Sequence, residues 1–186
     1  KSKRVLTQQI PYYSNSMLEN KKNDLNMMEY KNEVALGFEY ETAWDGFVIK
    51  NGRVRVNTGR DGGAGVSLRP NGVIKNCIVE NNWLVAPGKA GRGGGIFNNG
   101  GTIINCIVRK NGINHYSGYS DNEYYNYGGA MYLRTGTCFN SSFVENEVKS
   151  SHQIDGSAIY FEDGMFYNNT VTNNTGISAM CTKGWY

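Results

Sequence analysis

The chain reads Gly93-Gly94-Gly95-Ile96-Phe97 and, a few residues later, Asn105-Cys106-Ile107-Val108. Both segments recur in the same order along the chain. The first glycine recurs at positions 63, 93, 128 and 156, at spacings of 30, 35 and 28 residues. The Asn or Ser that opens the second segment recurs at positions 76, 105, 141 and 169, at spacings of 29, 36 and 28 residues. The two series agree, so we interpret both segments as parts of one repeating unit.

The apolar pattern of each repeat predicts short strands. Apolar runs of three to five residues are separated by Gly, Asn or charged residues, and no run has the length or period of a helix. Leucine-rich and propeller repeats have other frames or lengths. We therefore predict an all-β fold: a right-handed parallel β-helix, a solenoid of about five coils, each supplying two or three strands. A weaker copy precedes these repeats at Trp44–Asn51, and a truncated one follows at Ser178–Cys181.

Stacked coils align equivalent side chains into columns through the interior. Two such columns are expected, each of small or β-branched residues. The first holds Cys77, Cys106, Ser142 and Thr170, and the second holds Val79, Val108, Val144 and Thr172. Apolar residues also lie between the two sets, so alternation alone does not decide which face is buried. Asn at the turns suits left-handed backbone conformations, and stacked Asn side chains can hydrogen-bond along the column.

The repeat frame resembles that of secreted and surface β-helix proteins, including the pectate-lyase-like superfamily and the polymorphic outer-membrane adhesins. The stretch Trp44-Asp45-Gly46-Phe47-Val48-Ile49-Lys50-Asn51-Gly52 resembles a segment that often opens bacterial surface β-helices. Arg4-Val5-Leu6-Thr7-Gln8 resembles a strand that precedes it in those proteins. The resemblance implies the fold and a secreted or cell-surface location, but not the activity, because this fold carries unrelated functions.

Two regions are expected along the chain. Residues 1–41 would hold an N-terminal strand followed by an insertion, and residues 42–186 the parallel β-helix. Within the insertion, Ser16-Met17-Leu18-Glu19 is a capping-box pattern. A short helix near residues 17–35 could cover the open end of the β-helix, and a solvated loop is the alternative. The chain opens without Met or a signal peptide, so we expect a processed chain or part of a larger chain or assembly.

Composition excludes some partners. The net charge is only +3, which argues against a nucleic-acid partner, and no apolar stretch approaches the ~20 residues of a membrane span. Of the four cysteines, Cys77 and Cys106 would be stacked neighbours, either as buried free thiols or as a disulfide. No metal-binding or cofactor motif is expected: Asp61 fits a plain turn, and His115 and His152 have no ligand spacing.

The most variable connection runs from the Asn turn to the next glycine segment, and stacking would place its three copies on one side. The middle copy is rich in Tyr with Ser, Gly and Asn, a mixture found in binding loops. Packing of the tyrosines onto the flank of the coil is the alternative. The predicted ligand-binding residues are Trp83, Tyr116, Tyr119, Asp121, Glu123, Tyr124, Tyr125 and Tyr127.

The expected function is an extracellular or cell-surface β-helix that binds a polysaccharide or a surface protein through these loops. A carbohydrate-active enzyme using the same side is the first alternative. Glycoside hydrolysis would need two carboxylates, for which Asp121, Glu123 and Asp155 are available, and a lyase would need a base such as Lys89, Arg92 or Lys149. No catalytic residue can be assigned from the sequence. A structural stalk segment is the second alternative.

Overall fold

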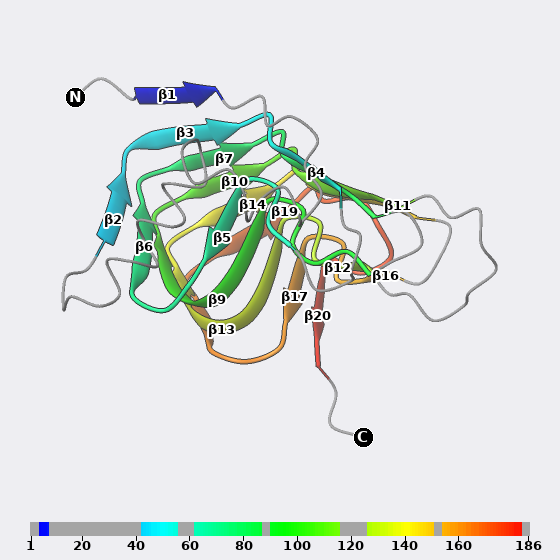
Figure 1. The fold of residues 1–186 in the computed structure, drawn as a ribbon. Helices are drawn as coiled ribbons and strands as arrows, with labels where there is room; N and C mark the ends of the chain where they lie inside the picture. The colour runs from blue at the N-terminus through cyan, green and yellow to red at the C-terminus, as the bar shows by residue number, and fades with distance from the viewer. Residues whose placement is uncertain are drawn as a thin grey trace.

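The structure is a computed structural model that describes residues 4–7, 42–55, 62–86, 90–115, 126–150 and 154–183 (Figure 1). These residues form β-strands and no helix, and every strand pairing among them is parallel. The all-β prediction is therefore confirmed. The helix expected near residues 17–35 falls outside the described residues.

A six-stranded sheet takes one strand from each repeat. Neighbouring strands of this sheet are far apart in sequence but adjacent in space, and they follow one another in the order of the repeats along the chain (Figure 1). The N-terminal strand predicted from the Arg4–Gln8 segment lies at the edge of this sheet, parallel to the strand at Phe47–Lys50. The strands are β1 (Arg4–Thr7), β3 (Phe47–Lys50), β7 (Ile78–Glu80), β10 (Ile107–Arg109), β14 (Ser142–Val144) and β19 (Thr170–Thr172).

Three further sheets hold the other strands of the repeats. The four-stranded sheet contains β4 (Arg53–Arg55), β8 (Trp83–Val85), β11 (Gly112–His115) and β15 (Glu147–Ser150). The two-stranded sheet contains β12 (Asn126–Tyr127) and β16 (Ile154–Asp155). The eight-stranded sheet contains β2 (Thr42–Asp45), β5 (Val66–Leu68), β6 (Gly72–Lys75), β9 (Ile96–Ile104), β13 (Met131–Phe139), β17 (Ile159–Phe161), β18 (Met165–Tyr167) and β20 (Met180–Thr182). This arrangement of parallel sheets is consistent with a parallel β-helix.

One interior column of the six-stranded sheet differs from the predicted one. Val79 pairs with Val108 as expected, but Val108 then pairs with Phe143, whereas Val144 lies beside Arg109. Phe143 is fully buried and Val144 is only partly buried. The sequence alignment of this repeat and of the next was therefore wrong by one residue, because Thr172 pairs with Val144 and Val171 with Phe143. The observed column is Ile49, Val79, Val108, Phe143 and Val171.

The same shift corrects the column of small residues. Cys77 and Cys106 are stacked, but the next position is Ser141, whose hydroxyl accepts a hydrogen bond from the Cys106 amide at 3.0 Å. Asn169 follows, and its Oδ1 accepts a hydrogen bond from the Ser141 amide at 2.8 Å. The predicted residues Ser142 and Thr170 instead belong to the neighbouring column. The shift arose because this repeat carries two consecutive serines, either of which fits a small corner.

All four cysteines are free, and Cys77, Cys106 and Cys138 are buried. A hydrogen bond from the Cys106 thiol lowers the pKa of Cys77 to about 7. The same hydrogen bond, together with burial, raises the pKa of Cys106. Because Cys77 and Cys106 are only 1% and 2% exposed, the pair serves as core packing and is closed to solvent.

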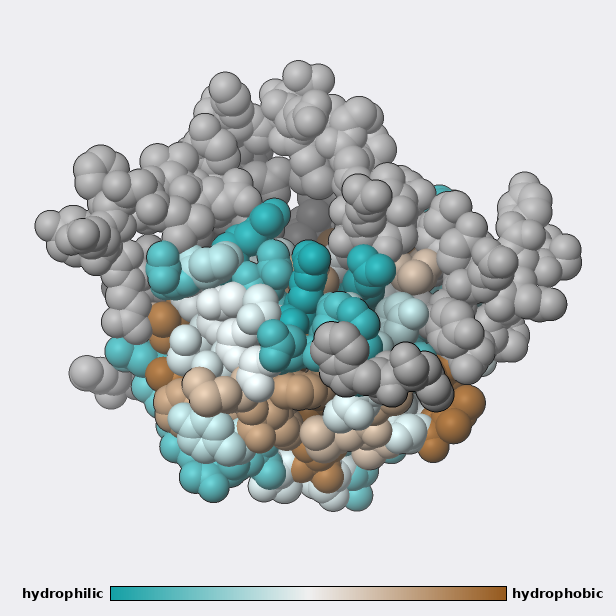
Figure 2. All heavy atoms as spheres, turned by 90° about the horizontal axis from the view of Figure 1, so that it is seen from below, coloured by the Kyte–Doolittle hydropathy of each residue, from teal (hydrophilic) through white to brown (hydrophobic). Residues whose placement is uncertain are grey.

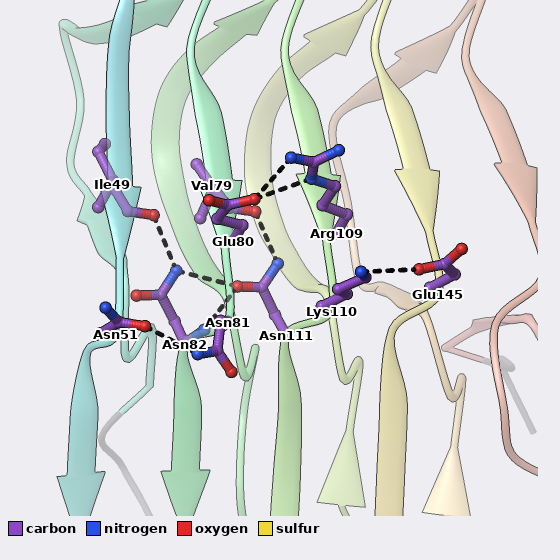
Figure 3. Close-up of polar contacts among 10 residues, drawn as sticks. All are labelled: Ile49, Asn51, Val79, Glu80, Asn81, Asn82, Arg109, Lys110, Asn111 and Glu145. Atoms are coloured by element: carbon purple, nitrogen blue, oxygen red, sulfur yellow. Dashed lines mark hydrogen bonds and ion pairs between the residues drawn. The ribbon is translucent and has the colours of Figure 1, made fainter. Parts of the chain in front are cut away.

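A column of buried asparagines joins the six-stranded and four-stranded sheets (Figure 3). The side-chain amide of Asn82 donates to the carbonyl of Ile49 at 3.1 Å and to Oδ1 of Asn111 at 2.9 Å. Asn111 repeats the pattern toward Val79 and Asn146. These amides are fully buried and satisfied, so the column holds successive repeats in one register.

Candidate functional site

The roots of the three variable connections lie on one side of the molecule, as stacking predicts. The strands that precede them, β8, β11 and β15, are paired with one another. The residues that follow them, Arg92, Tyr127 and Asp155, are also paired in succession. The connections therefore leave and rejoin the sheets at equivalent places.

Only two of the predicted binding residues lie in the described part of the chain, and they occupy different sheets. Trp83 is in the four-stranded sheet and Tyr127 is in the two-stranded sheet. Six predicted residues fall outside the described residues: Tyr116, Tyr119, Asp121, Glu123, Tyr124 and Tyr125.

The Trp83 side chain lies across the neighbouring strand. A Cβ on Gly112 would come within 2.7 Å of its Cζ3 atom, so the ring can lie there only because residue 112 is glycine. The Lys149 ammonium is 5.2 Å and the Arg53 guanidinium 5.9 Å from the ring centroid, within the range of cation–π attraction. The indole N–H donates to Oδ1 of Asn81 at 3.2 Å. Trp83 is thus held by its own sheet.

Tyr127 belongs to a second cluster, which the glycine turns create. Gly93, Gly128 and Gly156 have φ values of 64°, 66° and 68°, a region that glycine adopts easily. The chain changes direction at each of these glycines. The residue just before the glycine and the residue four positions after it therefore come to the same outer surface. We call this surface the turn-flanking patch. Its members are Arg92, Phe97, Tyr127, Tyr132, Asp155, Tyr160 and Glu162.

Aromatic rings form the centre of the turn-flanking patch. Phe97 and Tyr132 stack at a centroid distance of 5.5 Å, and Tyr132 and Tyr160 at 5.2 Å, with interplanar angles of 18°. Tyr127 meets the Tyr160 ring edge-on at 4.6 Å. Such offset and edge contacts add about 0.5–1.5 kcal/mol each beyond the burial of apolar area. The stack covers the ring faces, and Tyr132 and Tyr160 are only 6% and 9% exposed, so little of these two rings reaches solvent.

Two carboxyl groups flank the aromatic rings in contrasting environments. The Tyr132 hydroxyl donates to Glu162 at 2.6 Å, and the Lys183 ammonium donates to the same carboxylate at 2.8 Å. Burial acts to raise the pKa of Glu162, but these donors outweigh it and lower the pKa below its ordinary value. Burial raises the pKa of Asp155. Burial also raises the pKa of Tyr160, to about 12, so its hydroxyl remains protonated.

Arg92 leaves a donor unused beside the rings. Its guanidinium lies 5.8 Å from the centroid of Tyr132. The Nε atom is buried and has no hydrogen-bond partner within the described part of the chain. An unsatisfied buried donor costs about 1–3 kcal/mol.

Most of this patch was not predicted from the sequence. Arg92 and Asp155 were predicted only as candidates for catalysis, and Phe97, Tyr132 and Tyr160 were not among the predicted site residues. A signal does exist, since an aromatic residue stands directly after the buried Ile96, Met131 and Ile159. Alternation along a strand sends that aromatic side chain outward.

Within the described ranges, no cluster of three or more metal-binding side chains occurs and no helix is long and apolar enough to cross a membrane. Comparisons with protein-family models, with curated proteins and with solved structures find no match.

Proposed function

We propose that this chain is a right-handed parallel β-helix of an extracellular or cell-surface protein, and that its turn-flanking patch binds a glycan. The partly buried Arg92, Tyr127, Asp155 and Glu162 surround the stacked rings and offer polar groups that suit the hydroxyl groups of a sugar. The position of the patch supports the proposal too, because it adjoins the roots of the variable connections, where solenoids place binding functions.

The guanidinium of Arg92, held over the Tyr132 ring, is the observation that carries the proposal. Its Nε is buried, so a glycan oxygen would bind the outer nitrogens of this partly buried side chain, which the Tyr132 ring keeps in place. Glu162 offers acceptor oxygens on the same surface, already ordered by Tyr132 and Lys183. A donor and an acceptor are then available to one sugar residue or to its neighbour.

The test is a glycan array followed by calorimetric titration of the best ligand. Arg92→Gln keeps a polar side chain but removes the guanidinium, so we expect affinity to fall about tenfold or more, the size of a charge-assisted hydrogen bond. The matched control is Arg109→Gln, which removes a guanidinium paired with Glu80 on the outer face of the six-stranded sheet. Equal affinity of the Arg92 variant and the native protein would refute the assignment.

A carbohydrate-active enzyme is the second candidate. Asp155 and Glu162 both act on Tyr160 electrostatically, and their pKa values shift in opposite directions. Acid and base pairs in glycosidases show this contrast. Release of reducing ends or unsaturated products from a bound glycan would favour the enzyme. Binding without product would favour the binding module, and neither binding nor product would favour a structural stalk.

A further inference from the structure

The last repeat presents an edge that differs from the rest of the surface. Seen from below, the molecule carries apolar areas among polar ones (Figure 2). Of the five large apolar side chains that are exposed among the described residues, four lie between residues 165 and 180, and Ile177 is 78% exposed. The chain is also free of charged residues from 168 to 182. Exposed sheet edges are usually protected by Lys, Pro or other charges, so this edge lacks the ordinary protection against pairing.

The backbone of β19 is open on the outer side. Among the described residues β19 pairs only with β14. The Thr170 amide donates to the carbonyl of Ser141 at 2.9 Å and therefore points toward β14. Backbone groups of successive strand residues point to opposite sides, so the N–H and C=O of Val171 point away from the sheet.

The sequence around Val171 is the same in both directions. It reads Asn168-Asn169-Thr170-Val171-Thr172-Asn173-Asn174, with Val171 at the centre. If two copies of this strand lie antiparallel about a two-fold axis at Val171, each Thr170 faces a Thr172. Facing threonines are favourable cross-strand pairs. A second copy of the chain is therefore a partner that fits this strand across Thr170–Thr172.

We propose that two copies of this chain associate through this C-terminal edge, with β19 of one copy pairing antiparallel to β19 of the other at Val171. The two Val171 residues exchange both N–H···O=C hydrogen bonds, as the closely spaced pair of an antiparallel ladder does. The exposed Met165, Tyr167, Ile177 and Met180 belong to the same last repeat and add apolar surface at this end of the molecule. Such an interface is closed, so assembly stops at two copies.

Light scattering after size-exclusion chromatography, over a wide range of protein concentration, tests the proposal. Val171→Pro removes the outward N–H but leaves the hydrogen bonds to β14, a position where edge strands tolerate proline. We expect the dissociation constant to rise about tenfold or more, because two hydrogen bonds are lost. Val171→Ala keeps the N–H and is the matched control, with folding of both variants followed by circular dichroism.

A second pair of variants does not touch the strand backbone. Ile177→Lys places a charge on the most exposed apolar side chain of the last repeat, and we expect it also to favour the monomer. Ile107→Lys places the same charge on an exposed residue of the six-stranded sheet and should leave the dimer intact. A monomer at every concentration, an assembly that keeps growing beyond two copies, or a dimer that survives both Val171→Pro and Ile177→Lys would overturn the proposal.

Discussion

Asparagine occupies two kinds of position in this protein. Exposed asparagines such as Asn76, Asn105 and Asn173 adopt φ values of 54°, 50° and 54°, where asparagine is tolerated better than most residues. Buried asparagines such as Asn82 and Asn111 instead join one repeat to the next by side-chain hydrogen bonds. The first kind shapes the corner, and the second kind fixes the register.

The buried column should be far more sensitive to substitution than the turns. Asn111→Ala leaves the carbonyl of Val79 and the amide of Asn82 without their partners. We expect a loss of about 2–4 kcal/mol in the free energy of unfolding, measured by denaturant titration. The control is Asn173→Gly, which keeps an exposed positive-φ corner and should change stability by only a few tenths of a kcal/mol. Similar losses for the two variants would contradict the distinction.

Glu162 should make stability depend on acid pH. Its pKa is lower in the folded protein than the ordinary value of 4.5, so the stabilisation it provides is complete above pH 4.5 and is lost as the pH falls through the folded pKa. Glu162→Gln should therefore lower the melting temperature at neutral pH, and this difference should shrink in acid. Glu145→Gln, which removes an exposed ion pair with Lys110, is the control and should change the melting temperature little. A Glu162 difference that is constant with pH would contradict the prediction.

The glycine turn is the element that the sequence predicted best. Gly63, Gly93, Gly128 and Gly156 were aligned from their spacing alone, and the structure stacks the turns that contain them. Glycine gives a strong signal because few other residues meet both demands of this turn, a positive φ and close approach to neighbouring backbone.

Those two demands can be separated by substitution. Gly46 and Gly128 both have positive φ, but a Cβ at Gly46 meets nothing within 4 Å, whereas at Gly128 it would overlap the carbonyl oxygen of Met131. Gly46→Ala should cost about 1 kcal/mol of stability, the cost of the backbone conformation. Gly128→Ala should cost at least about 2 kcal/mol more, because the turn must also move. Equal losses of stability for the two variants in thermal unfolding would show that the close approach to the Met131 carbonyl does not affect stability.

The third repeat and the turn-flanking patch were harder to predict, for different reasons. Ser141 and Ser142 are equally small, so the apolar pattern allowed a shift of one residue that only the pairing of Val108 with Phe143 resolves. The patch depends on how the chain reverses at Gly128, which brings Tyr127 against Tyr132. Sequence spacing gives the order of these residues but not the side of the turn on which their side chains meet.

At the scale of the whole molecule, stability comes from columns that run through successive repeats. Phe143 is the largest fully buried side chain and lies between Val108 and Val171 in its column. Because each repeat contacts only its neighbours, removing one side chain weakens two interfaces at once.

This architecture predicts that substitutions of two adjacent residues differ sharply in how much they lower the free energy of unfolding. Phe143→Ala should lower the free energy of unfolding by about 3–5 kcal/mol, because it opens a cavity in the core. Val144→Ala, one position along and on the outer face beside Arg109, should lower it by less than about 1 kcal/mol. Equilibrium denaturation of the two variants measures the contrast. The reverse order would support the alignment that the sequence alone suggested.

A crystal structure would test most directly whether equivalent residues lie in register through the core. The decisive quantity is the Cα separation between Val108 and Phe143, and between Val79 and Val108. Each should equal one strand spacing, about 4.8 Å. A structure in which Val144 occupies the place of Phe143, or in which either separation exceeds about two strand spacings, would contradict the account.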